Sequence, residues 1–156
     1  LFALEGIRLI YYHLERAFRD GSDAVARLNV ALGSVYGGLG LGPVNTAAVH
    51  AIAYPLGSEY KIPHGISNAL LLPHVLEYNL PFGVERYAEI ARTIGVSKAS
   101  SSMETAREGI SMISELCTKV GIPKGIREYN VPADAVPSLA ESAMKVQRLL
   151  KNNLRD

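Results

Sequence analysis

Two histidines, His50 and His64, stand fourteen positions apart in the stretch AAVHAIAYPLGSEYKIPHG, residues 47–65. Neutral imidazole is a common ligand for iron and zinc, so the pair could belong to a metal site. His50 is surrounded by alanines, which leave room for a second helix or a ligand, and His64 stands between a proline and a glycine at an expected helix start. Two buried, hydrogen-bonded histidines would give the same pattern, so spacing alone leaves both interpretations open.

The remaining ligands of such a site are hard to find in the sequence. Metal sites normally use three or four protein ligands, and residues four apart on a helix share a face. The residues four before the histidines are, in chain order, Leu9, Thr46, Tyr60 and Leu70. None of them is acidic. The chain therefore supplies at most half of a usual site, unless a distant glutamate such as Glu59 or Glu77 joins the pair.

The elements that would position these histidines are all expected to be helices. Apolar residues recur with helical spacing, and no stretch alternates with a period of two. We therefore predict an all-α fold, a multi-helix bundle in which residues 1–156 form a single helical domain. The expected helices cover about 1–18, 22–36, 43–56, 65–78, 83–95, 102–121 and 137–150.

Three local features refine this prediction. We expect Ser22 or Asp23 to cap the second helix, Ser102 or Thr105 to cap the sixth, and 96–102 to form an exposed polar loop. The run GGLGLG at 37–42 is expected to break the chain. It is not a G-x-G-x-x-G dinucleotide motif, because the third glycine is missing and no strand precedes it. The apolar stripe of the second helix is expected to be Val25, Leu28, Ala31, Leu32 and Val35.

Composition excludes several classes of partner. The chain is 48% hydrophobic and 20% charged, with a net charge of +1 and one cysteine. This balance does not favour nucleic acid or an anionic membrane, and one cysteine allows no internal disulfide. No apolar run approaches the ~20 residues that span a bilayer. We expect a cytoplasmic protein without a membrane or nucleic-acid partner.

The segment NTAAVHAIAYPLGSEYKIPHGISNALLLPHVLEYN, residues 45–79, resembles the signature region of iron-containing alcohol dehydrogenases, which include lactaldehyde reductases and butanol dehydrogenases. The family pattern has a histidine after a helix of small residues, a Pro-Leu-Gly turn, Pro-His-Gly, and an apolar helix ending in LLPHV. FALEGIRLI, YAEIARTIGV and VGIPKGIREYNVPADAVPSLAESAM resemble other helices of the same domain. The resemblance thus extends over nearly the whole chain.

This resemblance implies a metal-dependent alcohol dehydrogenase that interconverts alcohols and aldehydes or ketones with NAD(P). Members have a nucleotide-binding N-terminal domain and a helical C-terminal domain that holds Fe2+, sometimes Zn2+, with one aspartate and three histidines. The second and third of these histidines match His50 and His64. The aspartate, the first histidine and the nucleotide-binding domain precede the matched region and are absent from this sequence. We therefore expect the isolated chain to be inactive.

Tyr54 marks a departure from the family. Members often carry a further histidine at this position, near the substrate and the nicotinamide. Four residues after His50, the Tyr54 phenol should look into the same cleft, either as a substrate-side wall or as a proton relay, although a reference pKa of about 10 suits neutral-pH proton transfer poorly. His74 and His13 are expected to be structural or surface residues.

A second hypothesis treats the chain as a stand-alone, non-catalytic helical module with a vestigial metal site, acting in binding or interaction. On either hypothesis we expect apolar residues near Ile62 and on the cleft side of the helix at 43–56 to be exposed. Exposed apolar patches favour self-association, so a homodimer is possible.

Overall fold

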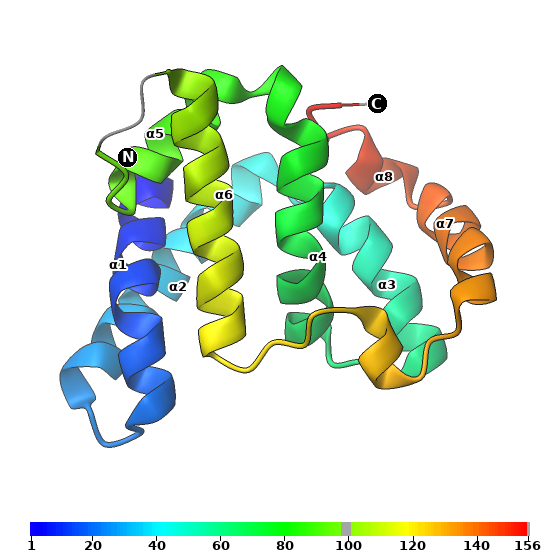
Figure 1. Cartoon of the computed structure of the whole chain (residues 1–156), viewed down its shortest axis with the longest axis horizontal. Helices are drawn as coiled ribbons and strands as arrows, with labels where there is room; N and C mark the ends of the chain where they lie inside the picture. Colours follow the sequence, from blue (N-terminus) through cyan, green and yellow to red (C-terminus); the bar gives the residue numbers. More distant parts are fainter. Residues whose placement is uncertain (98–100, 156) are drawn as a thin grey trace. The chain divides into compact units, whose positions relative to one another are not determined.

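The computed structural model describes residues 1–97 and 101–155, and every regular element among them is helical (Figure 1). This confirms the all-α prediction. Residues 98–100 of the predicted loop 96–102 lie outside the described part. The helices are α1 Phe2–Arg19, α2 Ala24–Val44, α3 Ala48–Tyr60, α4 His64–Asn79, α5 Val84–Thr93, α6 Ser102–Lys119, α7 Val136–Met144 and α8 Gln147–Leu150, with 3-10 turns at Leu80–Phe82, Ile126–Tyr129 and Ala133–Ala135.

Contacts divide the chain into two compact units. The first comprises Leu1–Val44 and Gly83–Val120 and contains α1, α2, α5 and α6. The second comprises Asn45–Phe82 and Gly121–Asp156 and contains α3, α4, α7 and α8. Both candidate histidines lie in the second unit. That the two units make one domain stays a prediction.

In the first unit, α1 and α2 pack through small residues. Gly6 and Gly33 are buried where the two helices meet, and a Cβ on Gly33 would lie 2.9 Å from the Gly6 carbonyl oxygen. The predicted apolar stripe of α2 is therefore wrong. Val25 and Leu28 are 60% and 69% exposed, because close backbone approach selects the face that carries Ala26 and Gly33.

The predicted break at 37–42 is also wrong, because α2 continues through the glycines to Val44. Glycine lowers helix stability by about 1 kcal/mol relative to alanine but does not prevent the helix. Helix α2 ends instead where Asn45 adopts a left-handed conformation with φ 67°. Asparagine visits this conformation more readily than most other residues. The predicted third helix consequently begins at Ala48, five residues later than expected.

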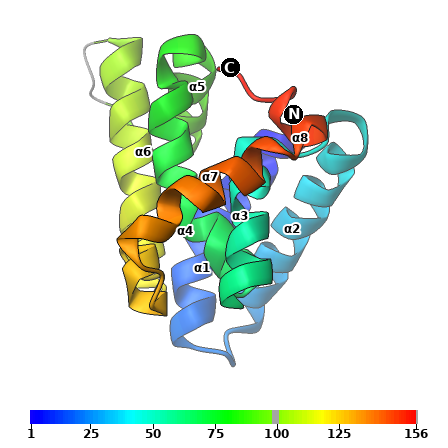
Figure 2. The same ribbon diagram turned by 90° about the vertical axis from the view of Figure 1, so that its right-hand side faces the viewer.

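The second unit is built on a core of Leu56, Ile62, Val131 and Leu139. Ile62 is only 2% exposed, so the expectation of an exposed apolar patch around it is wrong. Helix α3 runs to Tyr60, four residues further than predicted, and α7 packs across it (Figure 2). The predicted final helix is interrupted at 145–146, which separates α7 from α8.

The structure confirms the predicted side-chain cap of α2 and shows that the predicted cap of α6 is wrong. Asp23 caps α2, because its Oδ1 accepts a hydrogen bond from the Ala26 N–H at 2.9 Å. Helix α6 is capped by Ser101, whose hydroxyl accepts from the Glu104 N–H at 3.2 Å. The predicted caps Ser102 and Thr105 lie inside the helix, since the cap must precede the first helical residue.

Helices α5 and α6 pack against each other at Gly109, where the structure leaves no room for a side chain. A Cβ at Gly109 would overlap the Cβ of Ala91, and both residues are buried. Alanine normally stabilises a helix relative to glycine by about 1 kcal/mol. Here the overlap should reverse that preference.

We expect Gly109→Ala to lower the free energy of unfolding by about 1–3 kcal/mol, the usual cost of overpacking. Urea unfolding followed by circular dichroism measures it. Gly38→Ala is the matched control, because nothing lies within 4 Å of a Cβ there, and it should leave stability unchanged or raise it. Combining Gly109→Ala with Ala91→Gly should recover part of the loss. Equal effects at Gly38 and Gly109 would contradict the packing described here.

Candidate metal centre

The two candidate histidines are brought together by the corner between α3 and α4. Helix α3 ends at Tyr60, the next residue Lys61 adopts a left-handed conformation with φ 56°, and α4 begins at His64 directly after Pro63. The corner is tied down by hydrogen bonds: the Ile62 N–H donates to the Leu56 carbonyl at 3.3 Å. Helix α4 packs against α3, and the ring of its first residue, His64, lies close to that of His50 in the first turn of α3.

The imidazole rings of His50 and His64 lie close together. Their centroids are 5.2 Å apart, and the ring planes make an angle of 61°. Tyr54, one turn after His50, lies beside them, with its ring centroid 6.1 Å from that of His64 and the planes 26° apart. The structure therefore brings together the three residues that the sequence singled out.

The surroundings of His50 favour the neutral form of its imidazole. Burial lowers the pKa of His50, and the neighbouring His64 lowers it further. The side-chain nitrogen of Asn68 lies 3.1 Å from Nε2 of His64. The amide N–H therefore donates to Nε2, which accepts through the lone pair of an unprotonated nitrogen. The same amide group donates to the His64 carbonyl at 2.8 Å, which fixes its orientation. Neutral imidazole is the form that binds a metal ion.

The ring geometry can be tested against a metal ion. Bonds of about 2.0–2.1 Å at a tetrahedral centre would hold two imidazole centroids roughly 5 Å apart. The observed separation of 5.2 Å fits this requirement. Within 1–97 and 101–155, however, no group of three or more His, Cys, Asp or Glu side chains is placed to hold an ion. The described residues thus bring together only two candidate ligands, and neither Glu59 nor Glu77 completes a set of three.

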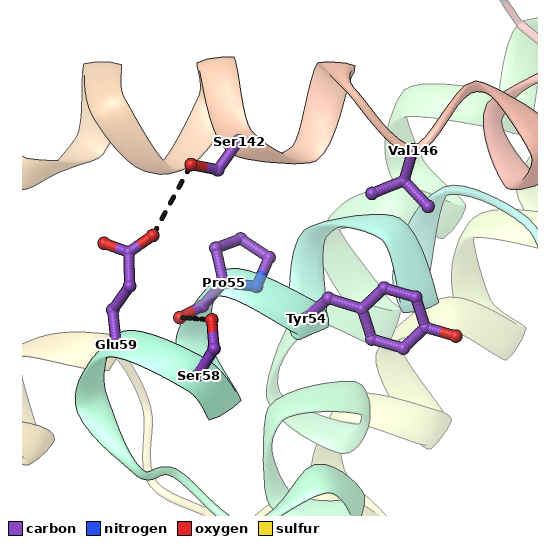
Figure 3. A pocket seen from close by; sticks show the side chains of 6 residues that line it. All are labelled: Tyr54, Pro55, Ser58, Glu59, Ser142 and Val146. Atoms are coloured by element: carbon purple, nitrogen blue, oxygen red, sulfur yellow. Dashed lines mark hydrogen bonds between the residues drawn. The ribbon is translucent and has the colours of Figure 1, made fainter.

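Glu59 instead lines a cavity beside Tyr54 (Figure 3). The cavity has a volume of about 420 Å³, and its lining includes Ser58, Ser142 and Val146. The Ser142 hydroxyl donates to the Glu59 carboxylate at 3.4 Å. Figure 3 shows the Tyr54 hydroxyl pointing away from these two groups. The Glu59 carboxylate and the Tyr54 hydroxyl therefore do not contact each other, and they have different hydrogen-bond partners.

Arg148 is a site residue that the sequence did not reveal. Its guanidinium donates to the Tyr54 hydroxyl at 3.3 Å, although the two residues are 94 positions apart. No sequence signal marks this pair, because α8 reaches α3 only through the packing of the second unit.

The other two histidines are not part of this pair: His74 is exposed, and His13 is half-buried in the first unit.

The chain is similar to known proteins over most of its length. The model for the C-terminal part of the Fe-containing alcohol dehydrogenase family matches residues 1–156. The chain is 39% identical to 1,3-propanediol dehydrogenase of Klebsiella pneumoniae over 144 residues, which are 92% of this chain and 37% of that protein. It is 41% identical to lactaldehyde reductase of Escherichia coli strain K12 over 123 residues, 78% of this chain and 32% of that protein.

A solved structure shares the fold. The crystal structure of a 1,3-propanediol oxidoreductase superposes with a TM-score of 0.95 at 36% identity, covering 99% of this chain and 41% of the other. This chain therefore spans well under half the length of the proteins it matches. In the described part, no helix has both the length and the apolar composition to cross a bilayer.

The histidine environment predicts a pH dependence of stability. A histidine with a depressed folded-state pKa binds fewer protons than the unfolded chain between that pKa and its model value of 6.5. The stabilisation is therefore complete above pH 6.5 and falls as the pH is lowered through this window. We expect NMR of the metal-free chain to show the His50 ring titrating below 6.5, with urea stability declining over the same range.

His64→Gln serves as the control for the second cause of the shift. It removes the neighbouring charge but leaves His50 half-buried, so the pKa of His50 should rise only part of the way. A His50 pKa at or above 6.5 in the wild-type chain would contradict the described burial.

Proposed function

The chain belongs to the Fe-containing alcohol dehydrogenase family, and we propose that it forms the metal-holding part of an NAD(P)-dependent enzyme that interconverts alcohols and aldehydes or ketones. His50 and His64 are the proposed metal ligands. The observation that supports this most directly is the 5.2 Å separation of their rings, which suits a shared ion. The metal is Fe2+ or Zn2+.

A metal ion bound here would act as a Lewis acid on the substrate oxygen, while the nicotinamide carries the hydride. The chain's own residues perform the positioning. His50 presents a neutral ring because burial and His64 disfavour its protonation. The Asn68 side-chain N–H donates to Nε2 of His64, so this amide sets the orientation of the second proposed ligand. An ion that binds through Nε2 would have to displace this hydrogen bond.

Tyr54 forms a wall on the substrate side of the proposed centre. Its ring lies alongside His64, and its hydroxyl is fixed by Arg148. A phenol in this position can orient a small alcohol or aldehyde, or relay a proton from it.

The proposed substrate is a small molecule, and nucleic acid and membranes are not proposed partners. A cytoplasmic location and a homodimer complete the proposal, and the exposed apolar face of α2 supports self-association.

NAD(P) binding is assigned to a part of the enzyme outside the matched region. The match covers 37% of the length of 1,3-propanediol dehydrogenase, which leaves ample chain for a nucleotide-binding domain and further ligands. Because two imidazoles give only part of the chelate, the isolated chain should bind metal weakly and catalyse no turnover.

The second candidate function is a non-catalytic helical module. Two observations favour it: no third ligand is placed near the pair in the described residues, and the Nε2 atom of His64 is already engaged by Asn68. On this alternative the histidines are retained without a bound ion, and the chain acts through its surfaces.

Metal binding separates the two candidates. We expect Zn2+, or Fe2+ under anaerobic conditions, to stabilise the chain by about 1–3 kcal/mol at roughly 10 to 100 times its Kd, a rise of a few degrees in Tm. His50→Ala should abolish this rise, because one imidazole alone retains little affinity. Differential scanning fluorimetry and isothermal titration calorimetry measure the effect.

His74→Ala is the matched control, since it removes an exposed histidine away from the pair and should leave the metal response intact. A metal-independent Tm in the wild-type chain would favour the non-catalytic module. A response that His50→Ala and His74→Ala reduce equally would exclude the proposed centre.

The role of Tyr54 requires an active enzyme, which a fusion can provide. The chain is joined to the portion of 1,3-propanediol dehydrogenase that precedes the matched region, and 1,3-propanediol oxidation is followed through NADH. If the phenol is a wall, Tyr54→Phe should retain kcat within about twofold, whereas loss of a proton relay should cost about 10²-fold or more. We expect the smaller effect, because Arg148 already occupies the hydroxyl. An inactive parent fusion would contradict the proposed function itself.

A further inference from the structure

The second unit contains a cavity that the proposed function does not use. It has a volume of about 660 Å³ and lies between α3, α4, α7 and α8. Its floor is apolar and buried: Ala48, Val75 and Ala143 are 7%, 8% and 4% exposed. Half-buried Ile52 and Leu71 extend the same surface. A cavity of this size and lining is typical of sites for small organic ligands.

The rim of the cavity is polar and basic. His74, Lys151 and Arg155 line it and are exposed, as is Gln147, whereas no aspartate or glutamate occurs among the described lining residues. Within 1–97 and 101–155, the Lys151 ammonium has no ion-pair or side-chain hydrogen-bond partner. An apolar floor beneath an unpaired cation favours a ligand with a hydrocarbon tail and an anionic head.

The rim is held in place by contacts with α4. The side chains of Asn79 and Asn153 exchange two hydrogen bonds of 2.8 Å, and Asn79 is only 5% exposed. The Arg155 guanidinium lies 4.2 Å from the centroid of the Tyr78 ring and donates to the Tyr78 carbonyl at 3.4 Å. A cation that is already positioned loses less conformational entropy when it binds an anion.

The cavity is separate from the proposed metal centre. Ala48 and Ile52 are four residues apart and share one face of α3, while His50 lies between them in sequence and projects about 160° to 200° away around the helix. Neither candidate histidine lines the cavity. A ligand here would therefore leave the His50–His64 pair unobstructed.

We propose that this cavity binds a free fatty acid of medium length, with its carboxylate at Lys151 and Arg155 and its alkyl chain on the floor. A tail of about ten carbons suits a cavity of several hundred Å³. The charge of the rim selects the head group: a neutral alcohol forms no ion pair with Lys151, and a cationic amphiphile is repelled.

Titration calorimetry of the whole 156-residue chain with decanoate below its micellar concentration tests the proposal. We expect saturable one-site binding that weakens at high salt, because the head group is exposed to screening. Decanol should bind at least about tenfold more weakly, and decyltrimethylammonium should not bind, since each lacks the anionic head. Metal-free protein is used throughout, so the result is independent of the proposed function.

Charge and filling variants locate the site. Lys151→Glu should weaken decanoate binding at least about tenfold, and Lys124→Glu, the same change at an exposed lysine outside the lining, should have little effect. Ala140→Trp places a large ring at an exposed lining position and should abolish binding without unfolding the chain. Circular dichroism confirms that each variant is folded.

Several outcomes would overturn the proposal. They are absence of decanoate binding at millimolar concentration, equal affinity for decanol, or equal effects of Lys151→Glu and Lys124→Glu. Binding to phosphatidylglycerol vesicles without binding of free decanoate would assign the rim to a lipid surface instead.

Discussion

The reversal of the chain between α3 and α4 is the constraint on which the candidate site depends. Lys61 adopts a left-handed conformation, which costs a non-glycine residue roughly 1 kcal/mol. Burial of the adjacent Ile62 in the core with Leu56 and Leu139 offsets that cost. The hydroxyl of the fully buried Ser67 donates to the Ile62 carbonyl, so the corner leaves that acceptor satisfied. Without this corner, His50 and His64 would not face each other.

Small residues determine how closely the helices of the first unit approach each other. Gly6 against Gly33, and Gly109 against Ala91, bring backbones so close that no larger side chain fits. Larger apolar residues are then displaced to other faces, which explains why the leucines and valines of α2 are exposed. Close approach of backbones, more than a continuous stripe of large side chains, organises the first unit.

The second unit presents two different chemical surfaces on opposite faces of α3. One carries the paired imidazoles, and partial burial together with the neighbouring His64 lowers the pKa of His50. The other carries small apolar residues, and α7 and the segment that follows it cover this face and form a cavity with a basic rim. The period of the helix separates the two, since residues two apart point in nearly opposite directions. A single helix therefore carries the candidate metal ligand His50 and the apolar floor of the cavity on separate faces.

The sequence by itself determined the all-α class, most of the helices and the family, and it singled out His50, His64 and Tyr54 as candidate site residues, whose rings the structure brings together. Helical periodicity is a local property, and the signature motif lies within one continuous window, so both can be read without a fold. Tertiary structure alone decided that α2 buries Ala26 and Gly33, that Ser101 caps α6, and that Arg148 reaches Tyr54 across 94 positions. Such contacts depend on which faces meet in space, and amino-acid spacing along the chain does not encode that choice.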